Sequence, residues 1–478
     1  MLFLLGSCLY HTGVTVAVAS RLAMYNPVDG ASWSQRSQRS THIVSALLLG
    51  ALAASLLCWR HSLMPKPEYA SESESVVTGK LMAARQRARA GKKTVFVTGA
   101  AGFVGLHTSL QLRAEGDTVV GIDSFNTYYD VSLKRNRAKL LAEAGVEVIE
   151  GNVCDGKLLR RILYDAEVTN VIHLAAQAGV RYSLTHPLEY IEANVKCFVT
   201  LLEAVHEVNY EIPIVYASSS SIYGLNKLTP FSEKHQADSQ ASLYGATKKA
   251  NENIAHVYHH LHQLKLTGLR FFTVYGPYGR PDMAYFSFTR AILEGRTITE
   301  FRNQDGTELQ RDFTYVSDIV SGVVAAMRLE APLEIFNLGN THPESVAKLV
   351  STLERGLGRS ANKTLAPIAA GDVPITYSDV THAQKRLGYS PKVSLEEGIH
   401  KFLMWYSEYY HVPLAANALD GEKSDVKPVS APVSHSPQER LHVHKDAHTD
   451  AHTDAHVGGS KYIAPSVRRI RHVKGRET

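Results

Sequence analysis

Tyr244 and Lys248 are the residues whose types and spacing most directly suggest chemistry. They stand four apart in SLYGATKKANENIAHVY, a stretch with helical character, so both side chains share one face. An ammonium group beside a phenol favours the phenolate and lowers its pKa from about 10 toward neutrality, which suits a general base acting on a hydroxyl. The same spacing recurs at Tyr223 and Lys227, but a glycine and an asparagine interrupt that stretch. We interpret the second pair as part of a loop without a catalytic role.

A run of four serines, Ser218 to Ser221 in VYASSSSIYG, directly precedes that region. The apolar residues before it predict a strand over 214–217, so the hydroxyls lie at the end of a strand. Serines in this position are often only turn formers. Next to a tyrosine and lysine helix, we predict instead that they bind a substrate oxygen and the Tyr244 phenol.

A glycine-rich loop defines the element on which the rest of the chain depends. The sequence KTVFVTGAAGFVG places Gly99, Gly102 and Gly105 at three-residue spacing immediately after a short apolar run. Glycines let a backbone approach a pyrophosphate closely, and the N-terminus of the following helix supplies N–H donors. Tight packing of a helix on a sheet could also explain them. Asp123, about twenty residues further on at the end of the next strand, suits the ribose hydroxyls of an adenosine and favours NAD over NADP.

The order of strands and helices predicts the fold class. Short β-branched or apolar runs at 118–122, 146–150, 171–174, 214–217 and 266–272 alternate with helical stretches. This alternation predicts an α/β fold with a Rossmann-like, doubly wound parallel sheet over residues 93–275. After about residue 275 the elements are shorter and separated by glycine and proline. We therefore predict a smaller α/β substrate lobe over 276–411.

The N-terminal region has a composition of its own. Twenty residues between Arg39 and Arg60 contain no Asp, Glu, Lys or Arg, which predicts a transmembrane helix at about 41–59 within an anchor region over 1–60. A buried core helix is the alternative. Residues 1–20 are also uncharged and could be a second hydrophobic signal. The arginines that precede the span place the N-terminus in the cytosol, so the bulk of the chain would be lumenal. The location we predict is the Golgi membrane. A plastid transit peptide or another endomembrane is the rival interpretation.

The segments that flank the predicted domain are polar. Residues 61–92, with two prolines and a SESES run, predict a stalk or linker. Residues 412–478 predict a disordered tail that carries His448, His452 and His456 four apart, a spacing that could bind a metal on a helix but is better explained by low complexity. Net charge is +5. Since residues 1–93 alone hold eleven basic against four acidic residues, the charge does not indicate a nucleic-acid partner.

Cysteines and a sequon bear on the compartment. Cys8 and Cys58 fall in hydrophobic N-terminal segments, and we interpret Cys154 and Cys197 as small buried apolar residues rather than a disulfide framework. The sequon Asn362-Lys363-Thr364 could carry a glycan only if the domain is lumenal.

Several motifs in register resemble those of the extended short-chain dehydrogenase/reductases that act on nucleotide sugars, and most closely the UDP-glucuronate 4-epimerases. They are TGAAGFVG, GIDSFNTYYDVSLKRNR, HLAAQAGVRYS, YASSSSIYG, the tyrosine and lysine pair, LRFFTVYGPYGRPDMA, RDFTYVSDIV and GDVPITYSDV. The resemblance covers residues 93–410. It implies that a tightly bound NAD takes a hydride from the sugar C4 and returns it to the other face, so UDP-glucuronate and UDP-galacturonate are interconverted.

The resemblance also implies roles for individual residues. Ser219, Tyr244 and Lys248 would be catalytic, Arg311 would meet the diphosphate and Asp372 the uridine ribose. Asn152 stands where the family commonly has an aspartate facing the adenine, and Cys197 stands where a glycine is common. The predicted cofactor-binding residues are Gly99, Gly102, Phe103, Val104, Gly105, Asp123, Asn152, Val153, Leu174, Ala175, Ala176, Tyr244 and Lys248.

The choice of sugar can be argued from chemistry. A 4-keto uronate is a β-keto acid and loses CO₂ unless its carboxylate is held, and Arg280 offers a bidentate fork while Thr273, Ser220 and Ser221 offer hydroxyls. A surface ion pair is the alternative role for Arg280. Related decarboxylases and dehydratases resemble STSEVYG or STDEVYG, whose acidic residues are serines in this chain. This difference argues against loss of water or CO₂.

Two further hypotheses stay open. The chain could be an epimerase or decarboxylase of a different UDP-sugar, or a catalytically silent NAD-binding module. The resemblance and the helices near Asn194 and Tyr244 suggest a homodimer through a four-helix contact.

Overall fold

The computed structural model describes residues 72–88, 92–369 and 371–414. The predicted membrane span at 41–59, the first hydrophobic stretch and the histidine-containing tail from residue 415 onward lie outside these ranges. Among the helices within the described ranges, none has both the length and the apolar character needed to cross a bilayer.

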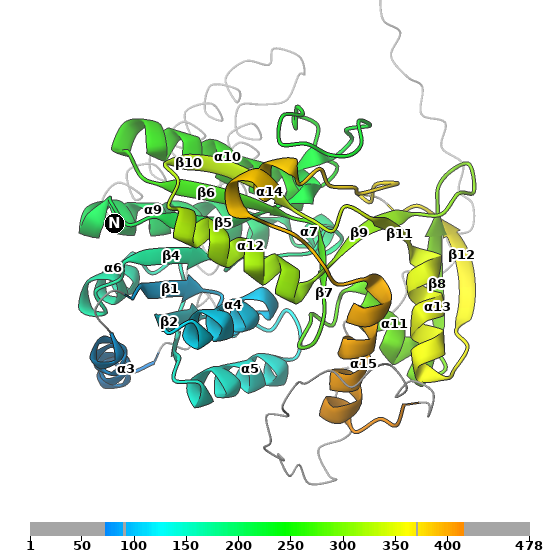
Figure 1. Cartoon of the computed structure of the whole chain (residues 1–478), viewed down its shortest axis with the longest axis horizontal. Helices are drawn as coiled ribbons and strands as arrows, with labels where there is room; N and C mark the ends of the chain where they lie inside the picture. Colours follow the sequence, from blue (N-terminus) through cyan, green and yellow to red (C-terminus); the bar gives the residue numbers. More distant parts are fainter. Residues whose placement is uncertain (1–71, 89–91, 370, 415–478) are drawn as a thin grey trace, which may run out of the picture. The chain divides into compact units, whose positions relative to one another are not determined.

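Seven parallel strands form the central sheet, in the order β10-β6-β5-β4-β1-β2-β3 (Figure 1). The strand order reverses direction between β1 and β4, which is the point where dinucleotides bind in doubly wound folds. The predicted Rossmann-like sheet is therefore confirmed. The strands are β1 (Thr94–Thr98), β2 (Thr118–Asp123), β3 (Glu147–Glu150), β4 (Asn170–His173), β5 (Ile214–Ser219), β6 (Leu266–Phe271) and β10 (Leu333–Leu338).

Helices cover both faces of this sheet, because the strands are apolar on both sides. One face packs against α4 (Phe103–Ala114), α5 (Val131–Glu143) and α12 (Val316–Leu329). The other face packs against α6 (Gly156–Asp165), α9 (Cys197–Asn209) and α10 (Leu243–His262). Short helical segments α7 (Tyr182–Thr185), α8 (Pro187–Tyr190) and the π-helix η1 (Ile191–Lys196) lead into α9.

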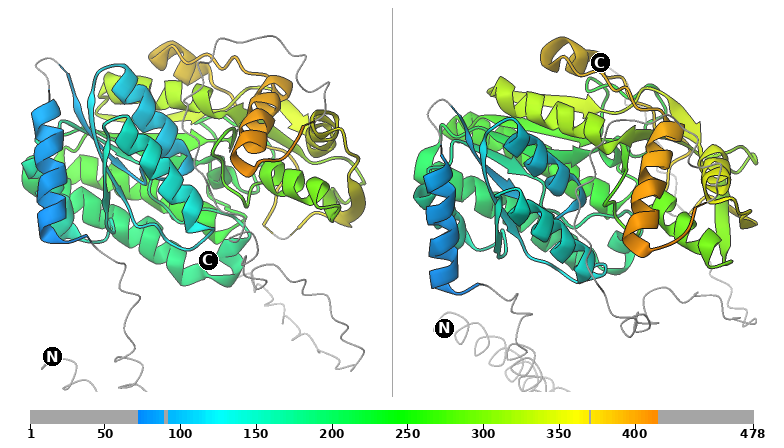
Figure 2. Two further views of the ribbon diagram at one scale, coloured as in Figure 1. Left: turned by 90° about the horizontal axis from the view of Figure 1, so that it is seen from below. Right: turned by 60° about the horizontal axis from the view of Figure 1, so that its bottom comes forward.

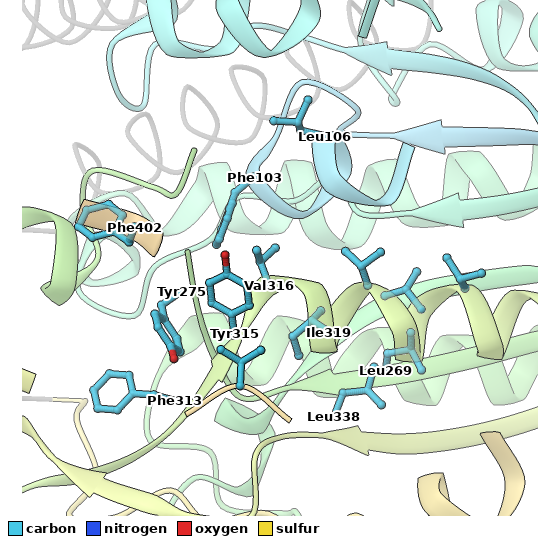
Figure 3. Packing of buried hydrophobic residues seen from close by; sticks show 14 of the residues in the cluster. Phe103, Leu106, Leu269, Tyr275, Phe313, Tyr315, Val316, Ile319, Leu338 and Phe402 are labelled. Carbon is cyan, nitrogen blue, oxygen red and sulfur yellow. The ribbon is translucent and has the colours of Figure 1, made fainter. Parts of the chain in front are cut away.

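The larger core joins the sheet to the C-terminal region. Figure 3 shows Phe103 and Leu106 of α4 facing Val316 and Ile319 of α12, with Tyr315 beside them, and these side chains are at most 7% exposed. The glycine-loop helix is therefore fixed by apolar packing along its length rather than by its N-terminus alone. Burial of this kind stabilises the fold by roughly 25 cal/mol per Å² of apolar surface.

The C-terminal region builds two small sheets, in the orders β11-β9-β7 and β12-β8. Their strands are β7 (Thr273–Tyr275), β8 (Thr297–Arg302), β9 (Gln310–Tyr315), β11 (Pro343–Ser345) and β12 (Asn362–Pro367). The helices nearby are α11 (Ala284–Leu293), α13 (Val346–Leu357), α14 (Thr381–Leu387) and α15 (Leu395–Tyr410). The predicted boundary at residue 275 does not divide the chain into two consecutive lobes, because α12 and β10 lie beyond it and pack with the central sheet.

The predicted linker over 61–92 is wrong for part of its length. Residues Glu74–Arg87 form helix α3, which lies against the β3 edge of the sheet (Figure 2). Val77, Leu81 and Ala84 are buried at spacings of four and three, so one apolar stripe docks while the charged residues face outward. Arg87 pairs with Glu147 at 2.7 Å. The linker was predicted because charged residues outnumber these three apolar residues in the segment.

The prediction for two cysteines is also wrong. Cys154, after β3, and Cys197, at the start of α9, form a disulfide that closes a loop with a sequence separation of 43 residues. Both sulfur atoms lie at the same end of the sheet, because Cys154 follows β3 and Cys197 follows the η1 segment. Cys197 is 5% exposed, so its predicted burial is correct while its predicted free state is not.

Candidate functional site

The glycine loop turns between β1 and α4 with little space to spare. Gly99 has φ of +69°, and a Cβ at Gly105 would lie 2.1 Å from the Gly99 carbonyl oxygen. Close packing therefore accounts for part of the glycine pattern. Gly102 caps α4 without any side-chain hydrogen bond, so the first-turn N–H groups of Phe103, Val104 and Gly105 stay available to an anion. The Phe103 side chain itself is buried in the core.

Polar groups that suit an adenosine lie at the next two strand ends. Asp123 ends β2, is 8% exposed and accepts a hydrogen bond from the Phe125 N–H at 2.9 Å. Burial raises the pKa of this carboxyl, and the nearby Lys134 and Arg137 oppose the increase. Asn152 and the buried Val153 follow β3, and the Gly151 N–H donates to the Asp123 carbonyl oxygen at 3.0 Å. The structure thus brings the predicted ribose and adenine residues side by side.

The segment after β4 forms the other wall of the loop. Leu174 N–H donates to the Thr98 carbonyl oxygen at 3.1 Å, and Ala175 N–H donates to Thr98 Oγ1 at 3.2 Å. A Cβ at Gly99 would lie 2.8 Å from the Ala175 nitrogen. Leu174, Ala175 and Ala176 therefore run directly beside the glycine loop, as predicted for residues along the cofactor. These fits support a bound dinucleotide.

Tyr244 and Lys248 lie on α10, whose N-cap Ser242 accepts a hydrogen bond from the Gly245 N–H at 3.1 Å. Burial raises the pKa of the Tyr244 phenol, while a hydrogen bond from Ser219 and the Arg280 charge oppose the increase. Lys248 is 3% exposed, donates to the Ala217 carbonyl oxygen at 2.8 Å, and has its pKa lowered by burial to about 8. The expected lowering of the phenol pKa by Lys248 is not seen, because desolvation dominates and the ammonium is bonded to Ala217.

The four serines have different surroundings. Ser218 is 2% exposed and donates to Glu252 Oε1 at 2.7 Å, so it belongs to the interior. Ser219 Oγ accepts a hydrogen bond from the Ser221 N–H at 3.2 Å and caps the 3₁₀ turn η2 (Ser220–Tyr223). A Cβ at Gly245 would lie 2.5 Å from the Ser221 carbonyl oxygen. The catalytic helix therefore lies directly against the serine turn.

Tyr223, which we predicted to have no catalytic role, has a structural role. It is 1% exposed, donates to Asn337 Oδ1 at 2.7 Å and accepts from Arg270 Nη1 at 2.9 Å. Arg270 also makes two bonds to Glu252, at 2.8 and 2.9 Å. This buried ion pair connects β6 to α10 one turn after Lys248.

Arg280 Nη2 and the Tyr190 hydroxyl lie 3.7 and 3.6 Å from where a Cβ at Gly179 would stand, and the Tyr190 ring centre is 6.1 Å from that of Tyr244. The Arg280 charge acts to lower the pKa of the Tyr244 phenol. Arg280 Nε and Nη2 donate to the two oxygens of Asp282, at 3.1 and 2.5 Å, and Tyr128 donates to the same carboxylate at 3.1 Å. Within the described part of the chain, Arg280 Nη1 has no acceptor. The predicted fork is thus half occupied by an internal carboxylate and half available to a ligand.

A buried arginine that the sequence did not single out joins these two parts of the site. Arg137 of α5 is 0% exposed and donates to the Ala101 carbonyl oxygen of the glycine loop at 3.2 Å. It also donates to the carbonyl oxygens of Tyr278 and Gly279, at 2.6 and 3.0 Å, just before Arg280. The motif SLKRNR could have identified it.

The residues predicted for the nucleotide end lie on the C-terminal elements. Arg311 of β9 donates to the Gln310 carbonyl oxygen at 2.8 Å, and burial lowers its pKa while Asp372 opposes the decrease. Asp372 accepts from Arg181 at 3.0 Å, and the Arg181 guanidinium lies 4.7 Å from the centre of the Phe301 ring. Arg181, within HLAAQAGVRYS, was not predicted.

The remaining predicted substrate residue, Thr273, begins β7 at the end of the small sheet. No group of three or more potential metal ligands occurs among the described residues.

The chain is similar to several known proteins. Residues 96–402 match the family described as GDP-mannose 4,6 dehydratase. UDP-glucuronate 4-epimerase 6 of Arabidopsis thaliana is 52% identical over 333 residues, covering 67% of this chain and 72% of that protein. UDP-glucuronate 4-epimerase 1 of the same plant is 47% identical over 387 residues, covering 78% and 90%. A crystal structure of UDP-glucuronic acid 4-epimerase from Bacillus cereus, in complex with UDP-glucuronic acid and NAD, has a TM-score of 0.62 and 34% identity, covering 66% of this chain and 100% of that one.

Proposed function

The chain belongs to the UDP-glucuronate 4-epimerase family of NAD-dependent short-chain dehydrogenase/reductases, and from this premise we propose how its residues carry out the reaction. The substrate is UDP-glucuronate, the product is UDP-galacturonate, and the enzyme holds NAD throughout the cycle. When bound, NAD takes a hydride from C4 of the sugar and returns it to the opposite face.

The observation that carries the assignment of residues is that Arg280 and Tyr244 both lie near Tyr190. The Tyr190 hydroxyl and Arg280 Nη2 lie 3.6 and 3.7 Å from where a Cβ at Gly179 would stand, and the centres of the Tyr190 and Tyr244 rings are 6.1 Å apart. In a uronate, the C6 carboxylate is attached to C5, next to the C4 that carries the reacting hydroxyl. A base for the 4-hydroxyl and a cation for the carboxylate must therefore lie close together, as these two residues do. A neutral hexose would leave Arg280 Nη1 without an anion.

Each chain residue then has a defined task. The Tyr244 oxygen accepts the proton of the 4-hydroxyl and later returns it, and Ser219 steadies the phenol and the sugar oxygen by hydrogen bonding. Because burial opposes ionisation of Tyr244, the phenolate forms only when positive charge lies close to it, and Arg280 supplies such charge, while Lys248 is held at the Ala217 carbonyl oxygen.

The carboxylate must also be restrained so that the 4-keto sugar keeps its CO₂. Arg280 is prepared for this task, since Asp282 and Tyr128 hold one side of its guanidinium and leave Nη1 for the substrate. Ser220, Ser221 and Thr273 provide hydroxyls around the same group, while Arg311 and Asp372 take the diphosphate and ribose.

Substitution of Arg280 tests this assignment. Arg280→Met should lower the rate of epimerisation at least tenfold and raise the ratio of released CO₂ to UDP-galacturonate, measured by NMR and CO₂ trapping. Arg296→Met removes an exposed arginine and is the matched control. If Arg280→Met turns over UDP-glucuronate normally, or gains no decarboxylation, Arg280 does not bind the carboxylate.

We also propose that residues 41–59 anchor the protein in the Golgi membrane with the catalytic part in the lumen. Two features support this location. A disulfide between Cys154 and Cys197 is typical of oxidising compartments. Asn362 and Thr364 of the sequon are both exposed on β12, and a glycan on Asn362 would replace the hydrogen bond that its Nδ2 donates to the Gly295 carbonyl oxygen at 3.0 Å.

Glycosylation offers a direct test of this location. Expressed with its own N-terminus in eukaryotic cells, the full chain should shift in mobility on treatment with an N-glycosidase, and Asn362→Gln should abolish the shift. The folded part should resist protease in sealed vesicles. A chain that shows no shift and is digested in intact vesicles would place the enzyme on the cytosolic side.

We further propose a homodimer formed by the helices near Asn194 and Tyr244. Exposed apolar side chains on α8, η1 and α10 support it, with Leu188 at 79%, Ile191 at 45% and Leu261 at 63% exposure. These three elements contact one another. Light scattering should give twice the monomer mass for the wild-type protein, and the Leu188→Lys variant should give a lower mass. A monomeric wild-type protein would contradict this proposal.

A further inference from the structure

Asn152 is held by two neighbours that form a disulfide with each other. Its Oδ1 accepts a hydrogen bond from the Cys154 N–H at 2.8 Å, and the Cys197 sulfur lies 3.7 Å from the same oxygen. Because a disulfide sulfur carries no proton, the second approach is a packing contact rather than a hydrogen bond. The covalent bond between Cys154 and Cys197 therefore links the two residues that contact the Asn152 Oδ1, one through its backbone N–H and the other through its sulfur.

The position of Asn152 in the fold indicates what this amide faces. The first-turn N–H groups of α4 suit the pyrophosphate and Asp123, at the end of β2, suits the ribose, so the adenine falls toward the next strand end, at β3. Asn152 follows β3 and its neighbour Gly151 is hydrogen-bonded to Asp123 at 3.0 Å. Since Oδ1 faces Cys154, the amide Nδ2 points away from it. Among the described residues Nδ2 has no acceptor, and it can donate to a ring nitrogen.

The other end of the disulfide is anchored in rigid structure. Cys197 is the first residue of α9 and directly follows the π-helix η1, and the Cys154 sulfur packs 3.8 Å from the Glu192 carbonyl oxygen of that segment. In η1, the Asn194 amide exchanges two hydrogen bonds with the Gln177 backbone, at 2.8 and 3.0 Å. The loop that carries Asn152 is thus tied to a segment that is itself held at the cofactor site.

We propose that the Cys154–Cys197 disulfide is a positioning element for the adenine end of the NAD site, so that its reduction weakens cofactor binding through Asn152. The inference rests on the assignment of NAD to this site. Neither cysteine touches the reacting atoms, and both act by fixing the amide that contacts the cofactor. The opened state should bind NAD about 3- to 10-fold more weakly, the range expected for a hydrogen bond that loses its alignment.

Reduction is chemically accessible from one side. Cys154 is partly exposed, whereas Cys197 is 5% exposed. A thiolate of a small dithiol attacks the Cys154 sulfur, the bond to Cys197 breaks, and Cys197 leaves as a thiolate that takes up a proton. The second thiol of the reductant then displaces Cys154 from the mixed disulfide. Two electrons and two protons pass to the protein, and the dithiol is oxidised to its cyclic disulfide.

The test measures NAD binding itself, without substrate. The full chain, stripped of nucleotide and carrying Cys8→Ser and Cys58→Ser so that only this pair responds, is titrated with NAD by calorimetry before and after treatment with a dithiol. Alkylation and mass spectrometry establish the redox state. A Cys154→Ala/Cys197→Ala double variant provides the opened state if the dithiol does not reach the bond, and Asn152→Ala removes the positioned amide.

The proposal predicts equal weakening in the reduced protein and in the double-alanine variant, and no redox response in Asn152→Ala. In the reduced protein and in the double-alanine variant, the turnover number and the KM for UDP-glucuronate at saturating NAD should be unchanged, which a general loss of structure would not allow. Equal NAD affinity in the oxidised, reduced and double-alanine proteins would overturn it, as would a complete lack of NAD binding. Redox-dependent NAD affinity in a protein that fails to convert UDP-glucuronate would instead refute the proposed function alone.

Discussion

The ion pair between Glu252 and Arg270 gives a prediction whose size follows from the structure. Both side chains are nearly inaccessible, at 2% and 3% exposure, and Arg270 donates to both carboxylate oxygens, at 2.8 and 2.9 Å. The low pKa of Glu252 reflects these bonds, which outweigh the cost of burial, and a further bond from Ser218. Removing Arg270 leaves a buried carboxylate whose remaining cation, Lys249, is 3.4 Å away and partly exposed, so most of its compensation is lost.

Arg270→Met should therefore cost about 3–5 kcal/mol of unfolding free energy. With an unfolding entropy of about 2.1 cal/mol/K per residue over roughly 340 described residues, this cost corresponds to a melting temperature about 4–7 °C lower. Adding Glu252→Gln removes the stranded charge and keeps an acceptor for Ser218, so the double variant should recover about half of the loss or more. Urea and thermal unfolding followed by circular dichroism measure both values.

Arg296→Met is the matched control for this substitution. Arg296 and Glu294 are 54% and 51% exposed, so the same change there should cost less than about 1 kcal/mol. Equal losses for the two methionine variants would refute the reasoning, because burial would then make no difference. A double variant no more stable than Arg270→Met would also refute it, since the stranded Glu252 charge could not be the cause.

Three other changes give separate tests. Tyr244→Phe should reduce epimerase turnover by at least a hundredfold while leaving the melting temperature within about 2 °C, and turnover near the wild-type rate would exclude Tyr244 as the base. Burial lowers the pKa of His107 to about 4 and that of His173 to about 3, so the unfolded chain binds more protons than the folded chain below pH 6.5. The unfolding free energy should therefore fall by up to about 2.7 kcal/mol per pH unit between pH 6 and 4. Denaturation curves that do not change across this range would contradict the burial of neutral histidines. Leu81→Ala should lower the unfolding free energy by about 2–4 kcal/mol, and removal of α3 should lower it by a similar amount or more. Equal urea midpoints for chains that begin at residues 72 and 92 would show that α3 does not stabilise the domain.

The strands and the catalytic helix could be predicted from the sequence because local pattern determines them. The apolar run before Gly99 and the four-residue spacing of Tyr244 and Lys248 each fix an element within a few residues. Helix α3 also had a signal, since Val77, Leu81 and Ala84 recur at helical spacing. Charged neighbours outnumbered them, so composition was given more weight than periodicity.

Contacts between distant segments were not predictable in the same way. Cys154 and Cys197 stand 43 residues apart, and no spacing rule indicates that a strand end and a helix start will meet. The Asp282 carboxylate on Arg280 and the Arg137 brace likewise depend on loops folding against each other. Sequence indicates which residues are chemically able to act, whereas tertiary packing decides which charges surround Tyr244.

The most direct test of the account is to incubate the purified full chain with UDP-glucuronate, without added NAD, and follow the nucleotide sugars by NMR. We expect UDP-galacturonate to appear, no CO₂ to be released, and the protein to retain its NAD. A UDP-pentose with CO₂ would contradict the role of Arg280. A lack of any product, even with NAD supplied, would contradict the assignment of the reaction.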